Sequence, residues 1–427
     1  MGSAGRDYHN YLRYYKNNPK YEVVAFTAAS QIPSLRHNVF PKILAGKKSI
    51  PIHPESELQS LIKRYKIDEV ALSYSDLSHA EVIDKASIVL ASGADFKLIG
   101  PNQTMIKSKK PLIAVCATRT GAGKGTIARK ILQILKGFKI KPVILRHPMP
   151  YSKRLEEQIV QRFVSYDDLD KNKCTIEERE EYQPYIDQGY TVYAGIDYTK
   201  IIRRAERDGK VIVFESGNND LSFFKPDLYI VVADPLRIDG LYSYPGEANV
   251  RLADLIIINK CNTAKSKDIS LLIKNIKKIN PKVPIIKGNS VISVDKLELI
   301  KGKSVLVIED SPTVTHGSLG YSAGYIAAKK YKAKKIINPK PYAVGFLKKI
   351  FKEYPHIKDV LPSTGYEKNE LRDLEKTINR INCNTVILGT PCDLTKIIKI
   401  KKPIVRVSYV FEEIGKKRLK QFIKKVV

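Results

Sequence analysis

Residues 116–131 read CATRTGAGKGTIARKI, and this stretch decides the fold. An apolar run at 112–118 precedes it, and the apolar residues that follow have the spacing of a helix. A strand, a glycine-rich turn, a lysine and a helix in this order are typical of a phosphate-binding loop. The usual signature G-x-x-x-x-G-K-[ST] is broken twice, because Thr118 replaces the first glycine and Gly125 replaces the hydroxyl residue after Lys124.

The loop keeps the groups that bind phosphate. Its small residues let backbone N–H groups point at phosphate oxygens, the following helix adds partial positive charge, and Lys124 supplies a cation. We expect Thr126, one position late, to supply the hydroxyl that contacts Mg²⁺. The sequence therefore predicts a site for ATP or GTP with Mg²⁺, and the alternative is a plain strand-to-helix turn. The loop residues predicted to bind the nucleotide are Arg119, Thr120, Gly121, Ala122, Gly123, Lys124, Gly125 and Thr126.

Short β-branched runs alternate with helical patterns along the chain, which predicts a parallel sheet covered on both faces. The runs lie at 21–28, 69–75, 95–101, 112–118, 142–148, 211–216, 227–234, 255–260, 283–288, 304–310, 384–393 and 403–413. We predict an α/β protein whose core is a P-loop NTPase-type parallel sheet at 111–300. An N-terminal Rossmann-like domain at 1–105 precedes it, and a C-terminal α/β region at 301–427, either separate or part of the core, follows it.

The motif GSAGRD at 2–7 resembles the glycine-rich turn between a first strand and a helix. Such a turn normally follows a strand, and here only Met1 precedes it. Three interpretations stay open: the first strand is missing from this sequence, the domain begins differently, or the segment is an ordinary flexible N-terminus.

Composition limits the class of protein. A chain of 427 residues with 43% hydrophobic residues is globular and long enough for two or three domains. No apolar run approaches the ~18 residues that cross a bilayer, and the N-terminus has no apolar stretch of a secretory signal. The five cysteines include no C-x-x-C pair, so neither a disulfide framework nor a zinc site is expected. We expect a soluble cytoplasmic protein with no membrane partner.

The formal net charge is +30. Such a charge is typical of nucleic-acid binding, but the lysines are spread along the chain, and no aromatic residues interleave a basic cluster. We favour a lysine-rich surface and a small anionic substrate, and nucleic-acid binding stays the alternative.

Polar residues follow several predicted strands, at the edge where parallel sheets bind ligands. Glu215 ends one run and resembles the carboxylate that holds Mg²⁺ in P-loop enzymes, and the alternative is a solvent-facing strand end. Arg146 offers a bidentate fork to phosphate, and His147 can move a proton near neutral pH, although a structural histidine is as consistent. The predicted catalytic residues are Lys124, Glu215, Arg146 and His147; the metal ligands are Thr126 and Glu215; the substrate contacts are Arg146, His147, Glu178, Asn218, Asn219, Asp220, Thr315 and His316.

The motif N-K-x-N at 259–262 follows another predicted strand. GTPases read guanine with N-K-x-D, whose aspartate accepts two hydrogen bonds from the base, and Asn262 cannot replace that anionic acceptor. We therefore expect Asn259 and Lys260 to lie at the nucleotide site, and ATP to be preferred over GTP. Asp234, at the end of 227–234, is a further lining candidate or a turn residue.

An acidic cluster lies at CTIEEREEYQPY, residues 174–185. Thr175 and Glu178 have the spacing of a capping box, which explains Glu178 without a function. Two polar turns later in the chain, 309–317 and 389–394, carry Thr313, Thr315, His316 and Thr390, which are candidates for contacts with substrate phosphate or ordinary turn residues.

The sequence resembles the cyclic 2,3-diphosphoglycerate synthetase family, found largely in archaea, whose relatives are often described as predicted GTPases. The resemblance runs from GSAGRD to GTPCDL and rests on AVCATRTGAGKG, RHPMPY, DLDKNKCTIEEREEYQPYIDQGYTVYAGIDY, SGNND, DLYIVVADPLR and YPGEANVRLADLIIINK. The Gly-Lys-Gly form of the loop is also similar to that of CTP synthetases, so the departure at Gly125 is compatible with a working site.

The resemblance implies an ATP-dependent enzyme. In that family ATP activates 2,3-diphosphoglycerate, whose two phosphates close into a cyclic anhydride with release of ADP and phosphate. It also implies a basic site for a phosphorylated substrate, an active-site position for the 174–185 cluster, and a homodimer. A GTPase-like regulator with the same nucleotide domain and a basic nucleic-acid-binding ATPase are the alternatives.

Overall fold

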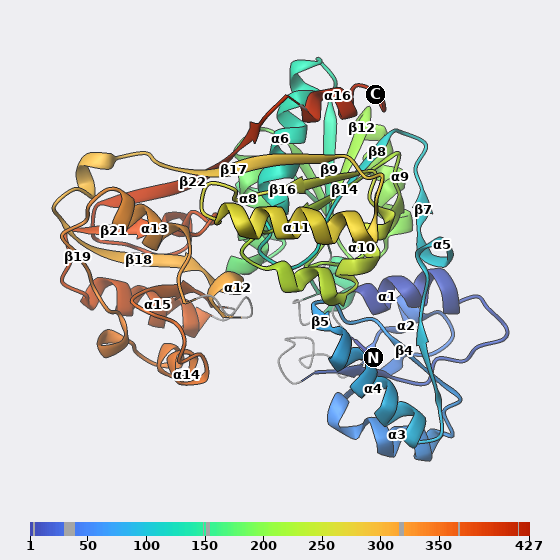
Figure 1. The fold of residues 1–427 in the computed structure, drawn as a ribbon. Coiled ribbons are helices and arrows are strands. Elements are labelled where there is room, and N and C mark those ends of the chain that lie inside the picture. Colours follow the sequence, from blue (N-terminus) through green and yellow to red (C-terminus); the bar gives the residue numbers. More distant parts are fainter. Residues whose placement is uncertain are drawn as a thin grey trace. The chain divides into compact units, whose positions relative to one another are not determined.

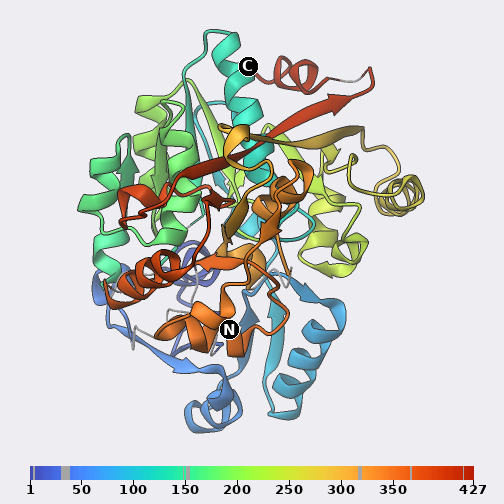
Figure 2. The same cartoon turned by 90° about the vertical axis from the view of Figure 1, so that its left-hand side faces the viewer.

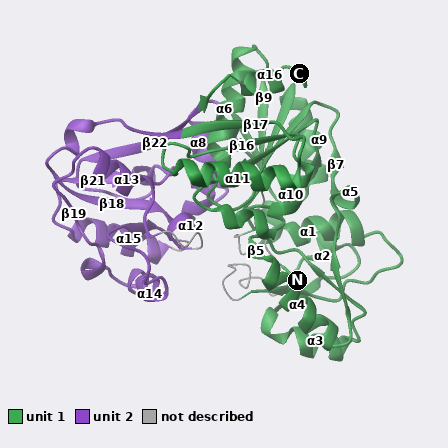
Figure 3. Ribbon diagram, in the orientation of Figure 1, with its two compact units in different colours: residues 1–162, 190–289, 413–427 green, residues 163–189, 290–412 purple. Residues whose placement is uncertain are grey.

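The computed structural model describes residues 1–2, 5–29, 39–147, 149–150, 154–315, 320–365, 368–416 and 418–427. They form two compact units (Figure 3). Unit 1 comprises residues 1–162, 190–289 and 413–427, and unit 2 comprises residues 163–189 and 290–412. Residues 1–105 thus share a unit with the P-loop, and 163–189 joins the C-terminal stretch. The division into three regions stays a prediction, because compactness alone does not define domains.

Unit 1 is built on a parallel sheet, as the alternating pattern predicted. Neighbouring strands are parallel in the order β11-β9-β12-β8-β14-β16-β17, and the P-loop strand β8 lies in the middle. Their bounds are β8 (Leu112–Ala117), β9 (Pro142–Arg146), β11 (Thr191–Ala194), β12 (Val211–Glu215), β14 (Leu228–Ala233), β16 (Leu255–Ile258) and β17 (Ile285–Val294). Every residue of β8, β9, β12, β14 and β16 is buried, because both faces of the sheet are covered.

Helices cover both faces of this sheet. Helix α6 (Lys124–Gly137) connects β8 to β9, in the direction of β11 along the strand order. The helices α9 (Tyr198–Asp208), α10 (Gly246–Leu252) and α11 (Ser266–Ile279) connect strands in the opposite direction, toward β17. Right-handed crossovers place these two sets on opposite faces. The apolar residues of α9 pack against β8 and β9, and those of α11 pack against β16. Figure 1 shows α10 and α11 side by side in front of the strands.

The N-terminal part of unit 1 has two small sheets. Parallel β1 (Phe26–Ala28) and β3 (Ile50–Pro54) form one with β2 (Val39–Phe40), and parallel β4 (Glu69–Leu72) and β6 (Asp95–Leu98) form the other. Helices α1 (Arg6–Asn10), α3 (Leu58–Tyr65) and α4 (His79–Ala91) complete it (Figures 1 and 2). Helix α4 begins after Ser78, which forms a reciprocal capping box with Glu81.

Residues 1–2 lie between the two small sheets. The Gly2 N–H donates to the Thr27 carbonyl at 2.8 Å, and the Ser73 N–H donates to the Met1 carbonyl at 2.9 Å. A cavity of about 520 Å³ lies beside them, lined among others by Phe26, Leu61 and Val70. The three interpretations of GSAGRD stay open.

The paired strands within unit 2 are also parallel. Strand β18 (Ser304–Asp310) pairs with β19 (Lys335–Ile336), β20 (Leu361–Ser363) and β21 (Thr385–Leu388), and β21 pairs with β22 (Ile404–Ile414). The longer helices of unit 2 are α8 (Ile176–Ile186), α13 (Ala323–Lys330), α14 (Phe346–Glu353) and α15 (Lys368–Arg380). Its core includes Val305, Leu347, Leu374 and Ile387.

No helix within the described residues is long and apolar enough to cross a membrane.

Candidate active site

The phosphate-binding loop follows β8 and ends at the first residue of α6, as predicted. Gly121 and Gly123 have φ angles of +79° and +102°, which residues with a side chain rarely adopt. At Gly123 an added Cβ would also lie 2.2 Å from the Asn259 amide nitrogen. These glycines therefore let the backbone turn sharply into the helix, and the start of α6 carries the partial positive charge that favours phosphate.

The Lys124 ammonium lies inside the site. The residue is 8% exposed, and its Nζ donates a hydrogen bond to the Asn218 carbonyl. Burial lowers the pKa of Lys124, and the nearby Glu215 carboxylate opposes that shift. When a phosphate binds, its anionic oxygen would take the place of the neutral Asn218 carbonyl as the acceptor for Lys124. The hydrogen bond between two charged groups would be stronger than the present one.

Asp76 contacts the same loop from the N-terminal part of unit 1. Its carboxylate accepts hydrogen bonds from the Thr120 N–H at 3.2 Å and from the Thr120 hydroxyl. Its own N–H donates to the Asn219 side chain at 2.8 Å, and its φ angle is +59°. Sequence reasoning missed Asp76. The available signal was its position just after a predicted strand, at an edge where ligands bind.

Glu215 and Arg146 form a buried ion pair at the ends of β12 and β9, which are adjacent parallel strands. They are 4% exposed each. A Cβ at residue 125 would lie 3.5 Å from a Glu215 oxygen, so this carboxylate lies against the start of α6. The Thr126 hydroxyl donates to the Gly123 carbonyl at 2.7 Å.

The residues around α6 fit a Mg²⁺ that is held mostly by nucleotide phosphates and water, with Glu215 as a protein ligand. The carboxylate beside residue 125 supports this fit. Among the described residues, no group of three His, Cys, Asp or Glu could hold a metal by itself. Mg²⁺ and its ligands Thr126 and Glu215 stay a prediction.

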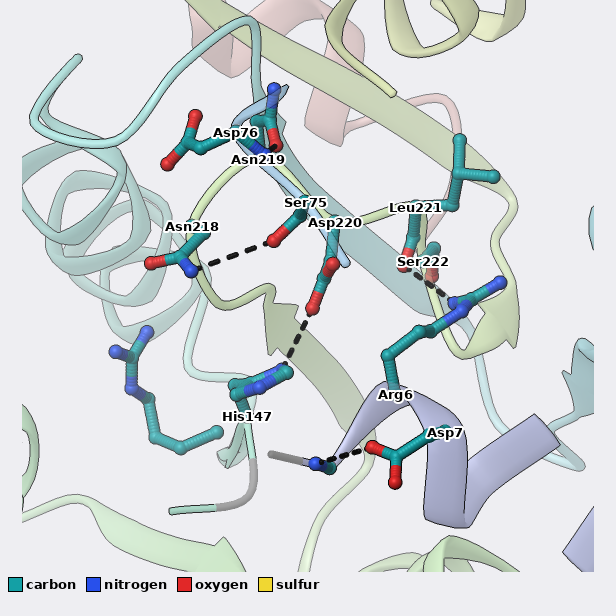
Figure 4. A network of polar contacts seen from close by, with 12 residues as sticks. Arg6, Asp7, Ser75, Asp76, His147, Asn218, Asn219, Asp220, Leu221 and Ser222 are labelled. Atoms are coloured by element: carbon teal, nitrogen blue, oxygen red, sulfur yellow. Dashed lines mark hydrogen bonds and ion pairs between the residues drawn. The ribbon is translucent and has the colours of Figure 1, made fainter. Parts of the chain in front are cut away.

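His147 and Asp220 meet beyond the end of β9 (Figure 4). The His147 Nδ1 lies 3.3 Å from an Asp220 carboxylate oxygen, and both side chains are largely buried. Burial raises the pKa of Asp220 to about 7, against the charge of Arg6. Arg6 comes from α1 and donates to the Leu221 carbonyl at 3.1 Å. The structure thus brings together a histidine, a carboxyl that titrates near neutral pH, and a guanidinium that the sequence did not suggest.

The predicted N-K-x-N residues lie against the loop. The Asn259 side chain donates to the Ala122 carbonyl at 3.1 Å, and its own oxygen accepts no hydrogen bond from the described residues. The Lys260 Nζ donates to the Gly121 carbonyl and to Asp234, both at 2.6 Å. These contacts hold the loop from β16.

Asn219 and Asn249 fix the 218–220 turn. The Asn219 side chain donates to the Thr118 carbonyl and to the Ser243 hydroxyl, both at 3.0 Å. Asn249, which sequence reasoning missed, is fully buried and donates to the Asn219 carbonyl at 2.6 Å and to the Ala117 carbonyl at 3.1 Å. One asparagine on α10 thus links the end of the P-loop strand to the turn that faces Lys124.

Some predicted site residues have other partners. Arg119 forms an ion pair with Asp239. Glu178 lies in unit 2, where it completes the predicted capping box with Thr175. Thr315, also in unit 2, donates to the Ser311 carbonyl at 2.8 Å. His316 lies outside the described residues. The structure gathers in unit 1 the predicted residues 119–126, 146–147, 215, 218–220 and 259–260.

Comparisons with known proteins identify relatives of this chain. The family model for the cyclic 2,3-diphosphoglycerate synthetase P-loop domain matches residues 190–289. Arginine synthetase ArcE of Thermococcus kodakarensis is 51% identical, and the match covers 99% of this chain and 95% of that protein. Cyclic 2,3-diphosphoglycerate synthetase of Thermococcus sibiricus is 24% identical, and the match covers 65% of this chain and 68% of that protein.

Among solved structures, LpxK from Aquifex aeolicus in complex with ATP is 13% identical, and the match covers 86% of this chain and 99% of the LpxK chain. Its TM-score of 0.43 is too low to establish a shared fold.

These matches confirm the predicted family and correct the predicted reaction. The expectation that the chain makes cyclic 2,3-diphosphoglycerate is wrong. The cyclic 2,3-diphosphoglycerate synthetase is only 24% identical to this chain. The arginine synthetase aligns with 99% of the chain, and its identity of 51% is about twice as high. The motifs that identified the family therefore did not distinguish its substrates.

Proposed function

Because the chain belongs to the P-loop family of cyclic 2,3-diphosphoglycerate synthetase, and shares 51% of its residues with an arginine synthetase in it, we propose that it is an ATP-dependent synthetase that makes arginine. The identity over 95% of that relative is the observation that carries the proposal. The nucleotide-binding loop in unit 1 supports the use of a nucleoside triphosphate.

The chemistry of the product defines the step. Arginine differs from its ureido analogue citrulline in one group, since a nitrogen replaces the ureido oxygen. That oxygen is a poor leaving group until it is phosphorylated. The γ-phosphate of ATP is transferred to the ureido oxygen, and a nitrogen nucleophile then attacks the ureido carbon. The C–O bond breaks, phosphate leaves with the former ureido oxygen, and the guanidinium remains.

The residues of unit 1 suit phosphoryl transfer, which depends mostly on positioning and charge neutralisation. The loop N–H groups and Lys124 would hold the phosphates, and Glu215 would hold Mg²⁺, which neutralises their charge. Arg146, paired with Glu215, adds a guanidinium at the same edge. His147 and Asp220 form the pair that can take up or release a proton near the acceptor.

Oxygen transfer tests the proposal directly. The protein is incubated with Mg·ATP, ammonium and citrulline labelled with ¹⁸O in the ureido group, and the phosphate is examined by phosphorus NMR. We expect ATP loss only when citrulline is present, arginine in equal amount to ADP, and ¹⁸O in the released phosphate. Hydrolysis of ATP or GTP at the same rate without citrulline, or arginine formed with unlabelled phosphate, would contradict the proposal.

A further inference from the structure

Asp76 places a negative charge on a loop that is built to bind phosphate. The residue follows β4 at the carboxyl end of the small β4–β6 sheet, and it is partly exposed. Its carboxylate accepts hydrogen bonds from the N–H and from the hydroxyl of Thr120. A carboxylate at this position repels the phosphates of ATP. A residue that opposes its surroundings in this way is expected where a function requires it.

The conformation of Asp76 is held by its neighbours. Its φ angle of +59° lies in the left-handed region, which residues other than glycine adopt uncommonly. Its N–H donates to the Asn219 side chain at 2.8 Å, and Asn219 is itself buried and donates to the Thr118 carbonyl at 3.0 Å. The turn at 218–220 therefore fixes a backbone conformation that keeps this carboxylate at the loop, as is typical of active-site residues.

Hydrogen bonds connect Asp76 to the phosphate-binding lysine. The hydroxyl of its partner Thr120 lies 3.1 Å from the side-chain oxygen of Asn218, and the Asn218 carbonyl accepts a hydrogen bond from Lys124. Burial lowers the pKa of Lys124, and the carboxylates of Glu215 and Asp76 oppose that shift. Asp76 and the cation that would hold the transferred phosphate therefore belong to one hydrogen-bonded group.

A second carboxyl, Asp220, belongs to the same group. The hydroxyl of Ser75 accepts a hydrogen bond from the Asn218 amide at 3.4 Å (Figure 4), and it also interacts with the Asp220 carboxyl. Burial raises the pKa of Asp220 to about 7, and the negative charge of Asp76 acts in the same direction. A ligand that carries N–H donors or positive charge would therefore stabilise both carboxylates.

The substrate of the proposed reaction carries such a group. A ureido group presents N–H groups on both of its nitrogens, as the guanidinium of arginine does, and a carboxylate can accept two parallel hydrogen bonds from them. In the phosphoryl transfer, the P–O bond to ADP breaks and its electron pair stays on ADP. A lone pair of the ureido oxygen forms the new P–O bond. No proton moves, so the ureido group gains a positive charge, which a carboxylate in contact with it stabilises.

We propose that Asp76 is a catalytic residue that binds the ureido group of the amino-acid substrate and stabilises the positive charge formed on it. The inference rests on the function proposed above. In this role Asp76 exchanges its bonds to Thr120 for bonds to the ureido N–H groups, which frees the Thr120 N–H for a nucleotide phosphate. Asp76 and Asp220 would repel a phosphorylated acid such as 2,3-diphosphoglycerate, so they also favour an amino-acid substrate.

Asp76→Asn tests the assignment, because it removes the charge and keeps the size of the side chain. We expect the KM for citrulline to rise and kcat to fall, each by about tenfold or more, while calorimetry shows no weaker binding of ATP. Asp239→Asn is the matched control, since Asp239 also brings a negative charge to the loop, through its ion pair with Arg119. This control should keep the citrulline KM within about twofold of the wild-type value.

An altered substrate tests the contact from the other side. Nδ-acetylornithine is citrulline with a methyl group in place of the terminal ureido NH₂, and it can be measured as an inhibitor. We expect its inhibition constant to differ by less than about threefold between the wild type and Asp76→Asn, because the N–H groups that Asp76 accepts are missing. Citrulline should instead distinguish the two proteins by about tenfold or more.

The outcomes separate the two proposals. Equal weakening of citrulline and Nδ-acetylornithine by Asp76→Asn would show a merely structural role and overturn the assignment. Wild-type KM and kcat for citrulline in that variant would overturn it as well. If the wild type makes no arginine from citrulline and ATP, the proposed function fails and the assignment falls with it. Thermal unfolding of each variant shows whether a changed KM is a loss of fold.

Discussion

Gly123→Ala is the substitution for which the structure gives the sharpest expectation. The residue has φ +102°, and an added Cβ would lie 2.2 Å from the Asn259 amide nitrogen. That contact is impossible, so the amide must move. Its hydrogen bond to the Ala122 carbonyl, 3.1 Å long and buried, is then lost. The loop would lose both its backbone conformation and its support from β16.

The magnitude follows from two terms. A side chain at positive φ costs about 1–2 kcal/mol. A buried hydrogen bond that is broken and left unpaired costs about 1–3 kcal/mol. We therefore expect Gly123→Ala to lower the free energy of unfolding by about 2–5 kcal/mol, the sum of these terms.

Gly121→Ala is the matched control. Gly121 also has positive φ, +79°, but nothing lies within 4 Å of its added Cβ. Gly121→Ala should therefore lower the free energy of unfolding only by the cost of a side chain at positive φ, about 1–2 kcal/mol. Urea unfolding measures both variants, and calorimetry measures their affinity for ATP. The double variant Gly123→Ala/Asn259→Ala should be less destabilised than the sum of its single changes, because the clash is gone. Equal losses for the two glycines, with additive behaviour of the double variant, would refute this reasoning.

Four further outcomes are expected. Lys124→Ala should lower kcat by about 10³-fold, since the cation on the transferred phosphate is lost, and near-wild-type turnover would contradict that role. Gly125→Ser should fold normally, because the atoms nearest to its Cβ are the flexible end of Arg129 at 3.3 Å and a Glu215 oxygen at 3.5 Å. Calorimetry should show that it binds Mg·ATP more tightly than the wild type. Weaker binding would argue that the usual hydroxyl position is not used. Asp76→Asn should tighten ATP binding, because it removes a negative charge from the loop, and an unchanged Kd would show that Asp76 moves away on binding. Burial raises the pKa of Glu178 from 4.5 to about 7. The protonated carboxyl therefore stabilises the folded state fully below pH 4.5, and this stabilisation is lost as the pH rises through 7. Urea midpoints should fall over that range in the wild type and fall less in Glu178→Gln, which keeps the capping bond.

The sequence predicted the elements whose signals are local. Each strand around the P-loop is a short β-branched run that is buried on both faces, and this signal does not depend on distant residues. The capping box at Thr175 was visible for the same reason, because its partner Glu178 lies three residues away.

Contacts between distant segments could not be read in this way. Asp76 and Arg6 lie far from the P-loop in sequence, and only the fold brings them to Thr120 and Asp220. The placement of residues 163–189 with the C-terminal unit has no local signal either. The predicted homodimer and the alternative of nucleic-acid binding are untested and stay predictions. The phosphorylated substrate was implied by the reaction that the comparisons overturn.

The contacts of α1 and Asp76 with the P-loop part of unit 1 restrict how this protein can have evolved. Arg6 and Asn10 line a cavity that Asp220 completes, and Asp76 bonds to the loop itself. If the first hundred residues were exchanged for those of an unrelated protein, both the cavity lining and the hydrogen bonds from Asp76 to the loop would be lost. We expect the N-terminal part and the nucleotide-binding part to be inherited together, and recombination within the family to occur elsewhere in the chain.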